Sequence, residues 1–115
     1  MLNKNIKPIR IGGFGEWYEF NNNKGERIVV EISVTHADPK SKNSLPNLWK
    51  KHGFIKEAYY DYINISVYVY DEKGCWSRYN PQHTKDHKIN FKWLLPESEA
   101  NKHKLLNEVY RLANK

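Results

Sequence analysis

The sequence has almost no cysteine and no long apolar run, and these two absences set the first limits on the protein. Its single cysteine, Cys75, excludes an internal disulfide and is typical of a reducing compartment. No run approaches the roughly 18 apolar residues of a membrane span. The opening stretch MLNKNIKPIR also lacks the apolar segment of a secretory signal. We therefore expect a cytoplasmic protein that makes no membrane contact.

Motifs for catalysis and for metal binding are missing as well. His83 and His87 have the spacing of a metalloprotease helix but lack its glutamate, and there is no Cys-x-x-Cys pair. Gly12, Gly13 and Gly15 precede EWYEF, which has the pattern of a strand, whereas a phosphate-binding glycine loop needs a helix N-terminus. We expect no cofactor and no metal, and we expect these glycines to form a bend or bulge between two strands.

The chain is rich in positive charge and in aromatic residues. Its 115 residues are enough for one hydrophobic core, so we expect a single domain spanning 1–115. A formal charge of +6 together with 14% aromatic residues favours a partner that offers both negative charge and flat rings. Nucleic acid is the first candidate with both properties.

The segments EWYEF and RIVVEISVT predict a first hairpin, because apolar and polar residues alternate along the second of them. A three-residue loop that ends at Gly25, with this glycine in the left-handed conformation, would pair Phe20 with Ile28 and Tyr18 with Val30. One face of the hairpin is then entirely apolar, which supports this register.

The stretch YYDYINISVYVYDEKGCWSRY predicts a second hairpin and contains six of the eight tyrosines. Alternate positions separate isoleucine and valine onto one face and most of the tyrosines onto the other. A loop that ends at Gly74 pairs Tyr70 with Trp76 and Tyr68 with Arg78. The tyrosine face thereby gains an indole and a guanidinium.

The remaining segments complete the expected fold. IKPIRI is expected to be an edge strand, because Pro8 cannot donate a hydrogen bond to a neighbouring strand, and KINFKWLL is expected to be the last strand. Helices are predicted at about 45–52 and about 97–113. The helix residues expected to face inward are Leu45, Leu48, Trp49, Leu105, Val109 and Leu112. We therefore predict an α+β fold with an antiparallel sheet of about six strands in the order βββα-βββα.

Positive charge is concentrated in two segments of the chain. Residues 38–56 carry five lysines against Asp38, and residues 78–92 carry Arg78 and three lysines against Asp86. Pairing of the fifth and sixth strands would bring both segments to one side of the sheet. The residues predicted to stack on bases are Tyr68, Tyr70, Trp76 and Arg78. The residues predicted to contact phosphates are Lys40, Lys42, Lys50, Lys51, Lys85, Lys88 and Lys92.

These patterns predict a non-catalytic protein that binds nucleic acid, and the asparagine-rich composition suggests a phage or mobile element. Single strands are favoured over duplexes, because no segment resembles a helix with several outward base-reading side chains. One alternative is a protein-interaction module or inhibitor that acts on a host nucleic-acid enzyme or defence protein, since tyrosine, tryptophan and arginine are also favoured at protein interfaces.

A third hypothesis is a small basic ribonuclease, which would use histidine for proton transfer and cations for the phosphate. Its residues would be Arg78, Tyr79, His83, Lys85 and His87. The pattern leaves one structural question open, which is whether the C-terminal helix covers the tyrosine face of the sheet or leaves it exposed.

Overall fold

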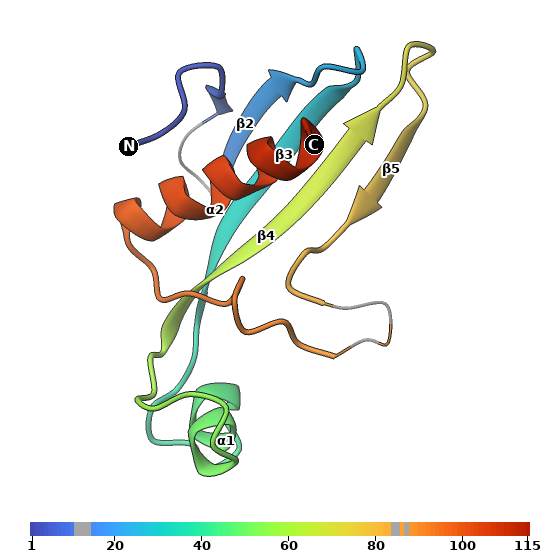
Figure 1. Cartoon of the computed structure of the whole chain (residues 1–115). Coiled ribbons are helices and arrows are strands. Elements are labelled where there is room, and N and C mark those ends of the chain that lie inside the picture. The colour runs from blue at the N-terminus through green and yellow to red at the C-terminus, as the bar shows by residue number, and fades with distance from the viewer. Residues whose placement is uncertain (11–14, 84–85, 87) are drawn as a thin grey trace.

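A computed structural model describes residues 1–10, 15–83, 86 and 88–115 of the chain. One antiparallel sheet contains five strands in the same order as in the sequence, together with two helices (Figure 1). The elements are β1 Lys7–Arg10, β2 Glu16–Asn21, β3 Arg27–His36, α1 Leu45–Lys51, β4 Asp61–Tyr70, β5 Trp76–Tyr79 and α2 Glu99–Ala113. The predicted α+β class is confirmed, with five strands where about six were expected. Within the described ranges, neither helix is long and apolar enough to cross a bilayer.

Both predicted hairpins have the expected register. All four cross-strand pairs are present, including Tyr68 opposite Arg78. Gly25 and Gly74 have φ angles of 80° and 81°, a backbone conformation that residues other than glycine rarely adopt. The two glycine turns therefore fix which residues meet across each pair of strands. Residues 11–14, which include two of the glycines expected to form a bend, lie outside the described residues.

The edge strand β1 pairs only with β2 among the described strands, as Pro8 predicts. Its register shifts between Pro8 and Arg10, so Arg10 lies opposite Trp17.

Helix α2 packs against the isoleucine and valine face of the sheet, in front of β2, β3 and β4 (Figure 1). It begins after Ser98, whose hydroxyl accepts a hydrogen bond from the backbone N–H of Asn101 at 3.1 Å. Its buried residues are Leu105, Leu106 and Val109. Leu112, predicted to be buried, is 40% exposed. Successive residues of a helix are rotated by about 100° around its axis, so the buried residues form a stripe centred near Val109. Leu112 lies at the edge of this stripe.

The segment 88–95, expected to be the sixth strand, contains a turn at residues 91–92 and an isolated bridge between Ile89 and His83. Beyond the short β5, the buried side chain of Gln82 occupies the edge of β4. Its Oε1 accepts a hydrogen bond from the N–H of Ile65 at 3.2 Å, and its Nε2 donates to the carbonyl of Ile63 at 2.5 Å. The N–H of Ile63 then donates to the carbonyl of Leu95 at 3.0 Å. One side-chain amide and one loop carbonyl thus satisfy backbone groups of β4 that a longer β5 would have paired.

Helix α1 lies at the opposite end of β3 and β4 from the two hairpin turns (Figure 1). Trp49 anchors it in a second apolar cluster with Tyr62 and Leu94. Leu45, predicted to face inward, is 49% exposed, because the adjacent Pro46 occupies the buried position at the start of the helix. The end of the sheet nearest α1 is therefore covered by this small cluster and not by α2.

Candidate nucleic-acid interface

The tyrosines of β4 lie on the face of the sheet opposite to α2. Side chains of a strand alternate between faces, and Ile63, Ile65 and Val67 are buried under α2. We call this other face of the sheet the open face. Among the described elements, none covers its half nearer the hairpin turns. Residues of β2 to β5 on that half include Trp17, Glu19, Arg27, Val29, Glu31, Asn64, Ser66, Tyr68, Tyr70, Trp76 and Arg78. The structural question raised by the sequence is thereby answered, since α2 packs on the aliphatic side.

Four side chains on the open face form what we call the aromatic cluster, with Tyr68 at its centre. The ring of Tyr68 lies 5.8 Å from that of Trp17 at an interplanar angle of 29°, and 5.8 Å from that of Trp76 at 57°. The guanidinium of Arg78 lies 5.8 Å from the centroid of the same ring. Trp76 is 60% exposed, so much of its ring surface is free to meet a partner. Three of the predicted stacking residues therefore contact one another.

Trp17 is a member of the cluster that the sequence analysis missed. It lies on β2 opposite Glu31, which in turn lies opposite Ser66 on β4. The signal was available, because the predicted pairing of Tyr18 with Val30 places Tyr18 on the aliphatic face and its neighbour on the other.

Hydrogen bonds within the open face hold the cluster in place. Arg78 donates from Nη2 to the hydroxyl of Ser66 at 3.0 Å, and the hydroxyl of Tyr68 donates to Glu31 at 3.3 Å. Asn64 donates to the hydroxyl of Thr35. The polar groups in the middle of the face therefore find their partners beside them on the sheet. Burial, followed by the charge of Glu31, raises the pKa of Tyr68, which keeps the phenol a hydrogen-bond donor.

The predicted stacking residue Tyr70 lies in a second arrangement of ring and cation. The guanidinium of Arg27 lies 5.5 Å from the centroid of the Tyr70 ring and forms an ion pair with Glu19 at 2.8 Å. The strand registers also place two cations of β1 on this face. In total, the charged side chains of the described strands on the open face are Lys7, Arg10, Arg27, Arg78, Glu19 and Glu31. Four cations against two carboxylates leave the face positive.

The predicted phosphate contacts of the first basic segment lie away from the aromatic cluster. These exposed lysines surround α1 and are Lys40, Lys42, Lys50 and Lys51. Trp49 of α1 contacts Tyr62, which lies six residues before Tyr68 on β4. At about 3.3 Å per residue, the separation along the strand is about 20 Å. These lysines therefore lie near the other end of β4 from the aromatic cluster.

The second basic segment is not brought to the cluster by a pairing of strands, because β5 pairs only with β4 within the described part of the sheet. Lys88 and Lys92 are exposed on the segment that follows Gln82. Lys85 lies outside the described residues. Arg78 is the predicted cation whose guanidinium lies over a ring of the cluster, that of Tyr68.

Of the potential metal ligands in the same segment, the structure describes His83 and Cys75. Among the described residues there is no group of three or more histidine, cysteine, aspartate or glutamate side chains that could hold a metal ion. His83 is exposed in the loop after β5, and Cys75 is exposed beside the turn before that strand. His87, which belongs to the ribonuclease hypothesis, lies outside the described residues.

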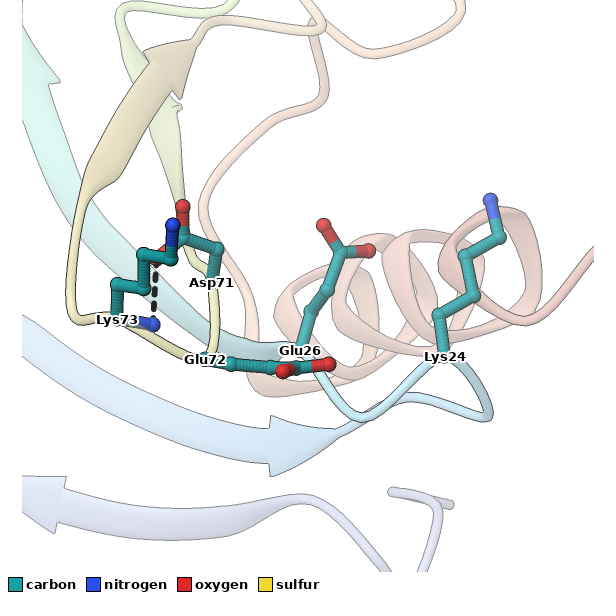
Figure 2. A pocket seen from close by; sticks show the side chains of 5 residues that line it. All are labelled: Lys24, Glu26, Asp71, Glu72 and Lys73. Atoms are coloured by element: carbon teal, nitrogen blue, oxygen red, sulfur yellow. Dashed lines mark hydrogen bonds between the residues drawn. The ribbon is translucent and has the colours of Figure 1, made fainter.

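A hollow of about 500 Å³ lies between the tips of the two hairpins (Figure 2). Three carboxylates and two lysines line it: Lys24, Glu26, Asp71, Glu72 and Lys73. Asp71 is committed to its own turn, because Oδ1 accepts the backbone N–H groups of Lys73 and Cys75 at 2.9 Å. The excess of carboxylates makes this hollow a poor site for phosphate.

No protein-family model matches the chain, and comparison with curated proteins and with solved structures finds no match either. The functional argument therefore depends on the geometry of the open face.

Proposed function

We propose that this protein binds single-stranded nucleic acid on the open face of its sheet and that it is not a catalyst. The observation that carries the proposal is the aromatic cluster on a face that α2 leaves uncovered. A base stacked on an aromatic side chain contributes roughly 1–3 kcal/mol, largely independent of sequence. Arg78 and the other cations of the face supply donors for the phosphates that accompany each base.

The form of the surface favours a single strand over a duplex. The bases of a single strand present their flat faces, whereas those of a duplex are stacked on one another and present their edges in the grooves. A sheet with exposed rings suits flat faces, and Trp76 is the most exposed ring of the cluster. The lone exposed cysteine supports a cytoplasmic location, and the composition supports a phage or mobile element as the source.

The test is binding of a fluorescent single-stranded oligonucleotide, followed by anisotropy at low and at moderate salt. Trp76→Ala is expected to weaken binding by about 5–150-fold, the equivalent of one lost stacking contact. Leu112→Ala is the matched control, because Leu112 is 40% exposed on α2, on the other side of the sheet. Absence of binding to any DNA or RNA oligonucleotide at low salt would remove the proposal. Equal effects of the two substitutions would remove the role of the cluster.

A protein partner is the second candidate, and the paired charges of the open face favour it. Glu19 and Glu31 lie among the cations, and each already contacts a neighbour on the same face. Carboxylates beside the rings disfavour a polyanion, whereas tyrosine, tryptophan and arginine are enriched at protein interfaces. The partner would be a host nucleic-acid enzyme or defence protein that this chain inhibits. Binding of such a purified protein that Trp76→Ala abolishes, with no affinity for oligonucleotides, would favour this candidate.

A further inference from the structure

A pocket of about 170 Å³ opens on the open face, in the half nearer α1. Three parts of the chain that are distant in sequence form its walls. Helix α1 supplies Leu45 and Trp49, strand β4 supplies Tyr62 and Asn64, and the segment after Gln82 supplies Ile89 and Leu94. Tyr62 and Asn64 belong to the same alternating row of β4 as Tyr68. The pocket is therefore a continuation of the surface that carries the aromatic cluster.

The walls of the pocket suit a flat, uncharged ring. The rings of Trp49 and Tyr62 meet edge to face at 5.3 Å, and both side chains are buried. Among the described residues that line it, there is neither a carboxylate nor an ammonium group, and His83 contributes an imidazole. Its volume is well below the roughly 300–1,000 Å³ of sites for drug-sized ligands, so it has room for one ring-sized group.

Two amides line the pocket, and they differ in what they can still bind. The amide of Gln82 is already hydrogen-bonded to backbone groups of Ile65, Ile63 and Trp93. Asn64 donates from Nδ2 to Thr35, and within the described residues its Oδ1 accepts no hydrogen bond. Asn64 therefore retains an acceptor and the second N–H donor of its amide. Neighbouring donor and acceptor groups match the edges of nucleobases, which asparagine can bind with two hydrogen bonds.

We propose that this pocket receives one unstacked base of the bound strand and that Asn64 reads its edge. The inference rests on the proposed function, and it adds base preference to a surface that otherwise binds by stacking. Asn64 lies four residues before Tyr68, about 13 Å along β4. A strand that follows β4 from the aromatic cluster meets the pocket next and the lysines around α1 last. Unstacked bases recognised by their edges are a common mode of single-strand recognition.

The experiment compares binding of poly-dA, poly-dC and poly-dT oligonucleotides of equal length, so that sliding of the strand does not change the result. The wild-type protein is expected to prefer one base by about 5–150-fold, which is the discrimination that a pair of hydrogen bonds provides. Leu45→Trp fills the mouth of the pocket from a position that is 49% exposed, and Asn64→Ala removes the reading group. Both variants are expected to bind all three oligonucleotides with similar affinity.

Leu112→Trp is the matched control, because Leu112 is 40% exposed on α2, on the other side of the sheet, and its variant should keep the preference. If the wild type binds all three oligonucleotides equally, the pocket reads no base, although the proposed function stands. A preference that survives in Leu45→Trp would come from stacking alone and would also overturn the inference. If none of the oligonucleotides binds, both the inference and the proposed function fail.

Discussion

Gln82 is the residue on which the lower edge of β4 depends. It is 4% exposed, and its amide satisfies the N–H of Ile65 and the carbonyl of Ile63. Gln82→Ala is expected to lower the free energy of unfolding by about 3 kcal/mol, because it leaves two buried backbone groups unpaired at about 1–3 kcal/mol each. Urea denaturation measures the change. His83→Ala, an exposed neighbour, should change stability by less than about 0.5 kcal/mol. Equal stability of the two variants would contradict the role assigned to Gln82.

Tyr18 links stability to alkaline pH. Burial, followed by the charge of Glu16 and the hydrogen bond to it, raises the pKa of Tyr18 from 10.0 to about 12. The folded state therefore holds the phenolic proton more tightly than the unfolded state does. This contribution to stability is complete below pH 10 and is expected to be lost as the pH rises from 10 towards about 12.

The measurement for Tyr18 is the free energy of unfolding of wild type and of Tyr18→Phe at a series of pH values. The variant lacks the phenol, so its stability should decline less steeply than that of the wild type in the alkaline range. Other groups titrate there as well, which is why the difference between the two curves is the quantity to examine. Parallel curves would show that the Tyr18 proton is bound equally in both states.

At the scale of the element, helix α2 determines which face of the sheet is open. Leu106 is fully buried against the aliphatic face, whereas Leu112 is 40% exposed. Leu106→Ala is expected to cost about 2–5 kcal/mol of stability, the usual range for a leucine deleted from a core. Leu112→Ala should cost less than about 1 kcal/mol, since most of what it removes already contacts water. Thermal or urea denaturation distinguishes them, and the reverse order would mean that α2 presents a different stripe to the sheet.

The hairpins were predictable because their geometry is local. Gly25 and Gly74 each fix a short loop, and the loop fixes every pair beyond it. The segment 88–95 was not predictable in this way. Its alternating apolar residues resemble a strand, which would place Ile89, Phe91 and Trp93 on one face, but Trp93 belongs to the cluster under α2 whereas Ile89 and Phe91 pack against the cluster of Trp49. A turn allows this arrangement, and the alternation of a strand does not.

The candidate site was predictable to the same extent as the elements that carry it. The cluster around Tyr68 follows from the register of one hairpin, so the contacts of Trp76 and Arg78 were anticipated. The pocket was not, because it forms only where α1 and the segment after Gln82 meet β4. The position of the α1 lysines depends on the same long-range packing, which a pattern of charges along the chain does not encode.

At the scale of the whole molecule, the features of the open face lie in a row along β4. The molecule is 47 Å long, and α1 lies at the opposite end of β3 and β4 from the hairpin turns (Figure 1). The residues of the aromatic cluster are near the turn end of β4, and those of the pocket are nearer α1. A short strand held by the cluster does not reach the lysines of α1, whereas a long strand does. Under the proposed function, the contribution of these lysines should therefore depend on the length of the oligonucleotide.

The double variant Lys50→Ala/Lys51→Ala tests this arrangement. It should weaken binding of an oligonucleotide of about 16 nucleotides and leave one of about 4 nucleotides unaffected, the two ends of the usual range of site sizes. For the long strand, the slope of log affinity against log salt should become shallower by up to about 1.4, because each phosphate contact contributes about 0.7. The control is Lys4→Ala/Lys104→Ala, which removes two exposed lysines outside the open face, one in the N-terminal segment and one on α2. If both oligonucleotides lose the same affinity, the bound strand does not follow the proposed path. If the control variant loses as much affinity as the test variant, Lys50 and Lys51 act only through the net charge of the protein.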